Sequence, residues 1–149
     1  MTSRRAGVFF AVPVEAAFDF LVDPRNRPAW QPSLRRVELL DDGEPHVGQR
    51  WLDVTVPGLR PRMSTVVLDR PRRWVERGQW RGVEAEGELT FSPVADGCPV
   101  GCTVAVAARV RGRGWRRPLG PVLTLVAGLA TGPDLRRAAR ILTERGPGQ

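Results

Sequence analysis

Six strand-like segments follow one another between residues 34 and 110, and this succession limits the folds that the chain can adopt. Turn sequences such as Asp41-Asp42-Gly43 and Pro57-Gly58 separate them, and no helical pattern of about 10 to 15 residues lies between any two. Such strands pair with their neighbours as an antiparallel meander, because parallel βαβ units need a helix in each crossover. The segments cover residues 34–40, 49–56, 62–68, 73–80, 84–91 and 102–110.

A seventh strand and two short helices are predicted ahead of this meander. Residues 8–12 are apolar and partly β-branched, as in a buried strand. Pro13 then takes the first position of a helix whose apolar residues recur every three to four positions as far as Leu21. Asp23, which precedes a proline, ends this helix, and its side chain can cap a second short turn over residues 25–30.

The C-terminal segment is predicted to be helical but not straight. One apolar stripe runs from Leu119 to Leu129, and a second runs from Leu135 to Leu142. On one continuous helix the two stripes would lie roughly 160° apart, so a single surface could not cover both. Thr131-Gly132-Pro133 offers a natural break between them, and we expect a kink or a full break there.

The length of 149 residues fits one domain over residues 1–149, with residues 146–149 as a frayed tail. The longest apolar stretch, residues 119–130, is shorter than the roughly 20 residues that cross a bilayer. Residues 1–5 are polar and do not begin a signal peptide. We therefore expect a cytoplasmic protein, either a monomer or a homodimer.

The net charge of +7 rests on 23 basic residues, all of them arginine. A composition rich in Arg, Ala, Gly, Pro and Val is typical of a GC-rich bacterial genome. The positive charge could also attract an acidic partner. One cluster of arginines directly precedes the apolar stretch 119–130. It is either a solvated linker or a contact with anionic lipid headgroups. Nucleic acid is the least favoured partner, because the arginines do not form an aromatic-interleaved stripe. The arginines that could reach a membrane are Arg111, Arg113, Arg116 and Arg117.

Cysteine and histidine are too few for a metal centre or a hydrolase triad. Cys98 and Cys102 form one CxxxC pair, explained by chance or by a local disulfide, whereas structural zinc needs four ligands. The single histidine, His46, lies in a predicted loop and could act as a general base only if that loop folds over a cavity. No glycine-rich phosphate loop is present in a strand–turn–helix context. We predict no metal and no cofactor.

Acidic residues on the predicted strands are the candidates for chemistry. Glu76 shares one face of its strand with Trp74 and Trp80, because strand side chains alternate. If that face points inward, the carboxyl must be paired or protonated, and it could orient a carbonyl or hydroxyl of a ligand. If the phase is reversed, Glu76 is solvated. Asp53 is equally ambiguous beside Trp51.

Three further glutamates alternate along the next strand. Glu84, Glu86 and Glu88 share one face and are interpreted as an outward polar stripe. Arg109 could pair with any of the acidic residues on these strands.

Several short motifs share their order and spacing with a known group of proteins. They are VFFAVPVEAAFDFLVDP at residues 8–24, Trp30, VGQRW at 47–51, DRPRRW at 69–74 and FSP at 91–93. Together they resemble the START-like (SRPBCC) superfamily, and within it the polyketide cyclase/dehydrase and lipid-transport proteins. The resemblance covers most of residues 7–145. The lengthened last hairpin and the interrupted final helix depart from the family pattern.

That resemblance implies an α+β helix-grip fold, in which a seven-stranded curved antiparallel sheet wraps around a C-terminal helix, with two short helices after the first strand. It also implies a cavity between sheet and helix for a hydrophobic small molecule, such as a lipid, a quinone or a polyketide. We expect a binding or carrier protein. The alternative is a polyketide cyclase or dehydratase that acts in the same cavity through Glu76, with Arg109 or His46.

The strand pattern also nominates residues for the wall of this cavity. Trp51 and Trp74 would supply flat apolar surfaces, whereas Trp30 is expected in the core. The expected lining residues are Phe10, Trp51, Val66, Trp74, Glu76, Leu89, Phe91, Val104, Val106, Leu123 and Val126.

Overall fold

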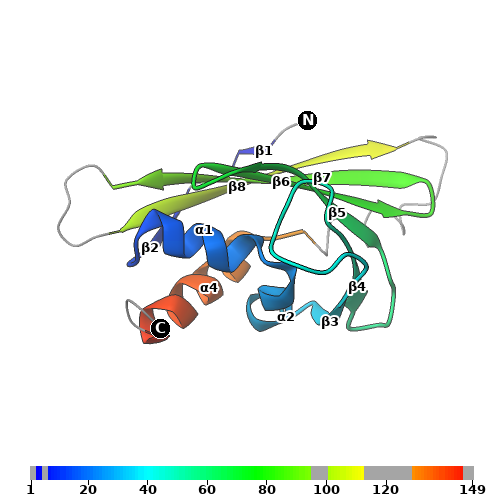
Figure 1. The fold of residues 1–149 in the computed structure, drawn as a ribbon, viewed down its shortest axis with the longest axis horizontal. Helices are drawn as coiled ribbons and strands as arrows, with labels where there is room; N and C mark the ends of the chain where they lie inside the picture. Colours follow the sequence, from blue (N-terminus) through cyan, green and yellow to red (C-terminus); the bar gives the residue numbers. More distant parts are fainter. Residues whose placement is uncertain (1–2, 5–6, 95–100, 113–128, 146–149) are drawn as a thin grey trace.

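A computed structural model describes residues 3–4, 7–94, 101–112 and 129–145, and it describes side chains within residues 7–94, 101–110 and 129–145. Strands occupy the middle of this part of the chain, with helices near its two ends (Figure 1). The elements are β1 (Ser3–Arg4), β2 (Val8–Phe10), α1 (Val14–Val22), the 3-10 turn η1 (Pro24–Asn26), α2 (Arg27–Trp30), β3 (Leu34–Leu39), β4 (Arg50–Thr55), β5 (Arg62–Asp69), β6 (Arg73–Trp80), β7 (Val83–Pro93), β8 (Cys102–Gly112) and α4 (Gly132–Arg145).

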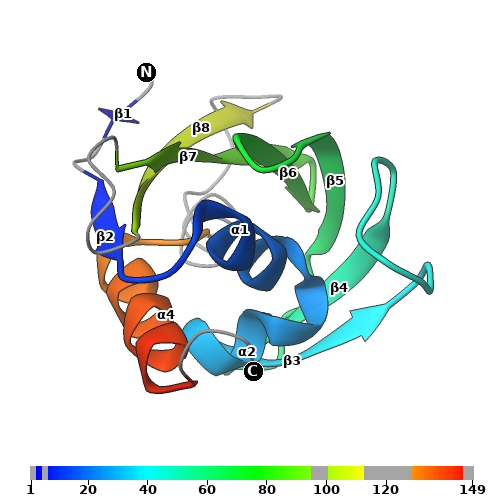
Figure 2. The same cartoon turned by 60° about the vertical axis from the view of Figure 1, so that its left-hand side comes forward.

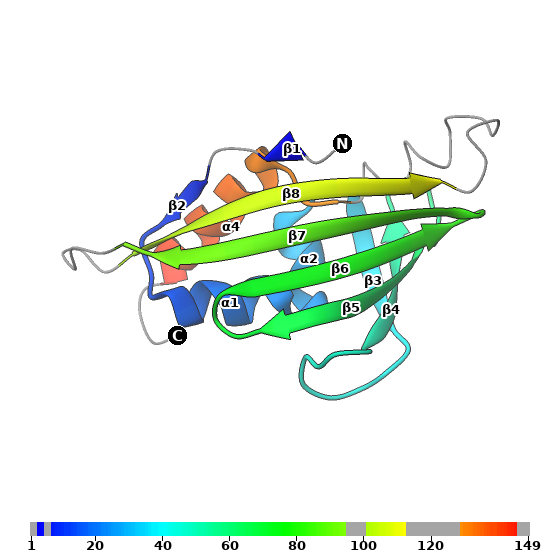
Figure 3. The same ribbon diagram turned by 90° about the horizontal axis from the view of Figure 1, so that it is seen from above.

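The strands form one antiparallel sheet in the order β1-β8-β7-β6-β5-β4-β3, and β2 pairs with β8 beside β1. The sheet curves around α1, α2 and α4, which all lie on its concave side (Figure 2). Seen from above, the long strands β5 to β8 lie side by side across these helices (Figure 3). The α+β helix-grip fold is therefore confirmed, with the two-residue strand β1 added to the seven predicted strands.

Alternation along β7 shows which face of the sheet points inward. The odd-numbered residues from 83 to 91 are buried, whereas the glutamates between them are half-buried on the outer face. Glu84 and Glu86 form ion pairs with Arg77 of β6, and Glu88 pairs with Arg73 of the same strand. The outward polar stripe is thus present, and the opposite face of the same strands supports the core.

The C-terminal helix begins where the sequence predicts a break. The Thr131 N–H donates to the Asp134 carboxylate at 3.0 Å, and the Asp134 N–H donates back to the Thr131 hydroxyl at 3.4 Å, which caps α4. Leu129 and Ala130 precede the helix in non-helical backbone. The rest of the predicted first helical stretch, residues 119–128, lies outside the described residues.

α4 packs against β2, α1 and α2 and closes the concave side near the sheet edge (Figure 2). Its apolar stripe of Leu135, Ala138 and Leu142 is buried in the main core. Among the residues that the structure describes, no helix combines the length and the apolar character needed to cross a membrane.

Candidate functional site

Three charged side chains meet on the inner face of the sheet, where all are buried from solvent. Arg27 comes from α2, Asp53 from β4 and Glu76 from β6, and their exposed fractions are 0%, 0% and 1%. Arg27 Nε and Nη2 donate to the two oxygens of Asp53 at 3.2 and 2.9 Å. Arg27 Nη1 donates to Glu76 Oε2 at 2.5 Å. We call these three residues the buried triad.

Local structure explains how Arg27 reaches the sheet. Asp23 ends α1 and accepts a hydrogen bond from the Arg25 N–H at 3.0 Å, which caps the turn η1. Asn26 Nδ2 donates to the Phe20 carbonyl at 3.0 Å and ties that turn back to α1. The short helix α2 then packs against β3, so that its first residue, Arg27, projects onto the inner face of the sheet.

Two tryptophans flank the acids of the triad. Trp51 precedes Asp53 by two residues on the same face, and its indole N–H donates to Asp53 Oδ1 at 3.0 Å. The Arg27 guanidinium carbon lies 5.6 Å from the centroid of the Trp51 ring, within range of a cation–π interaction. Trp74 likewise precedes Glu76 by two residues on the same face, but its indole N–H donates to Thr65 Oγ1 at 3.2 Å.

The triad holds one positive group against two acids, and all three are buried from solvent. Burial lowers the pKa of Arg27, but Asp53 and Glu76 together raise it further, so Arg27 stays charged. Burial raises the pKa of Glu76 to about 7; Arg27 lowers this pKa and the Asp53 charge raises it. Near neutral pH, Glu76 therefore exists in both protonation states, and it can either donate or accept a proton.

Gly87 gives the Glu76 carboxyl its space. The two residues are direct cross-strand partners in the β6–β7 pairing. A Cβ at position 87 would lie 3.2 Å from Glu76 Oε1 and 3.2 Å from Leu129 Cδ2, closer than most such contacts. The second oxygen of Glu76 thus lies at the boundary between the polar triad and an apolar wall that includes Leu129.

Most residues nominated as a cavity wall do lie together on the inner face. Trp30 lies fully buried in the core, as predicted. Val66 falls at an irregularity in the β5–β6 pairing and is only half-buried. Leu123 and Val126 lie outside the described residues. The nominated residues that are buried are Phe10, Trp51, Trp74, Glu76, Leu89, Phe91, Val104 and Val106.

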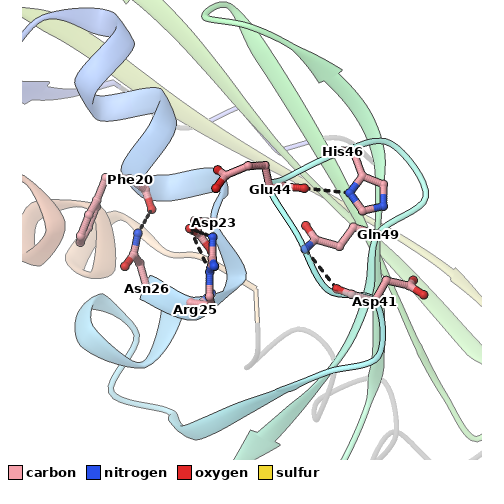
Figure 4. A network of polar contacts seen from close by, with 8 residues as sticks. All are labelled: Phe20, Asp23, Arg25, Asn26, Asp41, Glu44, His46 and Gln49. Carbon is pink, nitrogen blue, oxygen red and sulfur yellow. Dashed lines mark hydrogen bonds and ion pairs between the residues drawn. The ribbon is translucent and has the colours of Figure 1, made fainter.

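His46 and Arg109 do not join Glu76. His46 is exposed in the loop ahead of β4, where its Nδ1 lies 2.8 Å from the Glu44 carbonyl oxygen (Figure 4). Arg109 is exposed on the outer face of β8, opposite Glu86 in the register. The partner of Glu76 is Arg27 instead, because α2 lies on the concave side of the sheet and Arg109 points to the convex side.

Arg27 is the residue that sequence reasoning missed. It is one of two arginines in the short turn at residues 25–30, and nothing in its spacing marks it as buried. The available signal was indirect: an inward-facing Asp53 and Glu76 need a cation, and α2 is the element that faces them.

The arginine cluster and the cysteine pair lie partly outside the described residues. The side chains of Arg111, Arg113, Arg116 and Arg117 lie outside those described, as does Cys98. Cys102 is a free, buried thiol, so it forms no local disulfide, and burial raises its pKa to about 11.

A separate open groove of about 610 Å³ lies between β2 and α4. Phe9 of β2, which is 50% exposed, lines one side, and Ala139 and Thr143 of α4 line the other. Arg136 and Arg140 also border it. This groove shares no lining residue with the buried triad, so the two can be perturbed independently.

Solved structures of several bacterial proteins share the fold at low sequence identity. A protein of Deinococcus radiodurans is 23% identical, covers 94% of this chain and 95% of its own, and has a TM-score of 0.59. A protein of Mesorhizobium loti is 12% identical, with 98% of each chain covered and a TM-score of 0.65. A START superfamily protein of Mycobacterium smegmatis is 17% identical, covers 97% of this chain and 95% of its own, and has a TM-score of 0.62.

A search of curated proteins found no match. The model of one protein family, described as polyketide cyclase/dehydrase and lipid transport, matches residues 1–146. This match spans both the sheet and the helices that carry the buried triad. The chain belongs to the polyketide cyclase/dehydrase and lipid-transport family.

Proposed function

We propose that the protein binds a hydrophobic small molecule, such as a lipid, a quinone or a polyketide, between the inner face of its sheet and its C-terminal helix. The observation that carries this proposal is the buried triad of Arg27, Asp53 and Glu76. The description of the family, which spans lipid transport and polyketide chemistry, supports the same ligand class.

Burying the three charges of the triad is costly. Taking ions out of water costs several kcal/mol each, and apolar residues of similar volume often give a more stable core than a buried ion cluster. A triad that includes a carboxyl with a strongly shifted pKa is therefore more typical of a working site than of a structural one. A few polar groups among apolar walls are also the usual make-up of a small-molecule site.

The surroundings of the triad suit a flat or extended apolar ligand. Trp51 and Trp74 offer broad surfaces on either side of the acids, and Leu89 and Phe91 continue the apolar face along β7. In this arrangement the apolar part of a ligand packs on the sheet and its polar end meets Glu76.

A second function, as a cyclase or dehydratase, is favoured by one observation. Burial raises the pKa of Glu76 to about 7, which is the range in which a carboxyl transfers protons efficiently at neutral pH. Glu76→Gln separates the two functions, because glutamine keeps a polar side chain of the same shape but cannot transfer a proton. A carrier keeps its affinity in this variant, whereas an enzyme keeps its affinity and loses turnover of a polyketide substrate.

The test of the binding site uses Nile red, a neutral apolar dye that fluoresces on entering a protein interior. Gly87→Val places two methyl groups against Glu76 and Leu129, and we expect it to weaken dye binding at least tenfold. Thr143→Trp is the matched control, because it narrows the outer groove and leaves the triad untouched.

Circular dichroism must show that both variants are folded, and Gly87→Ala serves as a milder change if the valine variant is not. Failure of the wild-type protein to bind Nile red or any apolar ligand at micromolar concentration refutes the proposal. Loss of binding in Thr143→Trp alone assigns the ligand to the outer groove instead.

A further inference from the structure

We infer that the interior site accepts apolar molecules with a neutral hydroxyl end and rejects carboxylates of the same length. This inference rests on the proposed function and narrows its ligand class. In practical terms, long-chain alcohols and phenols bind, whereas free fatty acids are excluded.

The charges of the buried triad do not cancel when both acids are ionised. Arg27 contributes one positive charge from α2, and Asp53 and Glu76 contribute two negative charges from β4 and β6. With both acids ionised, the described part of the site carries a net charge of −1. A second buried anion would meet like charge in a medium of low dielectric constant, where repulsion is far stronger than in water.

The neighbouring ionic groups do not neutralise this net negative charge. Arg77 of β6 points to the outer face, where it pairs with Glu84 and Glu86. Arg109 of β8 is exposed on that same outer face. On α1 and η1, Asp23 and Arg25 form their own pair at the surface.

The hydrogen-bond donors beside the triad already bind groups of the protein itself. Each of the three guanidinium nitrogens of Arg27 already donates to a carboxylate oxygen. The indole N–H of Trp51 is taken by Asp53, and that of Trp74 by Thr65. A carboxylate entering this site would compete with Asp53 and Glu76 for the same guanidinium, and so would weaken the pairing of an existing buried charge.

Two buried donors have no hydrogen-bond partner among the described residues, and they are Trp30 Nε1 and the Ser33 hydroxyl. Both are neutral, so they can donate to the oxygen of an alcohol or ketone but cannot offset the charge of an anion.

The site offers the Glu76 carboxylate as its acceptor. Glu76 Oε2 receives Arg27, whereas Oε1 lies at the Gly87 side, next to the apolar wall around Leu129. An ionised carboxylate is an acceptor only, so it pairs with a group that brings its own proton. A hydroxyl supplies that proton at no net charge, and a carboxylate has none to give.

The experiment compares two ligands that differ only at the polar end. Displacement of Nile red by 1-dodecanol and by dodecanoate is measured at pH 8 on the wild-type protein. We expect dodecanol to bind at least tenfold more tightly than dodecanoate. Because protonation of Glu76 removes the net charge, the preference shrinks at pH 6.

Two variants tie the preference to the triad. Glu76→Gln neutralises the site and reduces the preference for the alcohol about tenfold. Glu86→Gln removes a glutamate on the outer face of the adjacent strand, and it leaves the preference unchanged. The comparison of pH 8 with pH 6 on the wild-type protein gives the same information if Glu76→Gln does not fold.

The possible outcomes distinguish failure of the selectivity inference from failure of the proposed function. If dodecanoate binds the wild-type protein as tightly as dodecanol, the selectivity inference is wrong although the proposed function stands. If neither ligand nor Nile red binds, both are wrong. A preference that Glu76→Gln leaves intact, or that does not change with pH, contradicts the assignment of selectivity to this charge.

Discussion

The raised pKa of Glu76 makes the stability of the fold depend on pH in an unusual direction. Most acids in proteins have lowered pKa values and stabilise the fold as pH rises. Burial raises the pKa of Glu76 from an ordinary value of 4.5 to about 7, so the folded chain holds this proton more tightly than the unfolded chain does. The contribution of Glu76 to stability is therefore fully present at low pH and is lost as pH rises from about 4.5 to 7.

The size of the effect follows from the shift itself. Each pKa unit corresponds to about 1.4 kcal/mol, so the full shift is worth about 3 kcal/mol of unfolding free energy. Most of this loss falls between pH 5 and pH 8. Glu76 is 1% exposed, so solvent screening does not reduce the estimate in the way that it does for surface acids.

The assay is urea unfolding, followed by circular dichroism at several pH values from 5 to 8. The wild-type protein should lose about 2 to 3 kcal/mol across this range, and Glu76→Gln should lose much less. His46→Gln is the matched control, because His46 is the one histidine in the chain and is exposed. Equal pH dependence in the wild-type protein and Glu76→Gln refutes the reasoning.

Two further predictions concern the groups that hold the site. Arg27→Met leaves Asp53 and Glu76 buried without a cation, so urea unfolding at pH 7.5 should show a loss of about 3 to 5 kcal/mol, smaller at pH 5, where protonation relieves the repulsion. An unchanged stability would contradict the pairing that we describe. Thr131→Ala removes the side chain that caps α4, and thermal unfolding should report a loss of about 1 kcal/mol; a loss close to zero would show that Asp134 alone suffices.

The fold could be predicted from the sequence because its signals are local and repeated. Strand segments separated by turn residues identify a meander, and the bounds of β6 were predicted to the residue at Arg73–Trp80. The start of α4 was also readable, because Thr131-Gly132-Pro133 stops one apolar stripe before another begins. These features depend on neighbours a few residues apart, which is the range over which sequence patterns carry information.

The site was only half predictable because its key contact is not local. Alternation put Glu76 on the same face as Trp74, but it could not decide which face was inward. The Arg27–Glu76 contact joins residues 49 positions apart and depends on how α2 packs against the sheet. Arg109 was one possible partner of these acids, but it lies on the outer face of β8, because a strand presents alternate side chains to opposite faces.

Stability and selectivity have one common origin here, which is the buried carboxyl of Glu76. Because burial disfavours its charged form, stability falls as Glu76 ionises, and the resulting negative charge opposes entry of a carboxylate. Glu76→Gln should therefore abolish both the pH dependence of unfolding and the preference for alcohols over carboxylates. If Glu76→Gln loses the pH dependence of unfolding but keeps the preference for alcohols, selectivity comes from the shape of the apolar wall. The charge of the triad then does not set the ligand class.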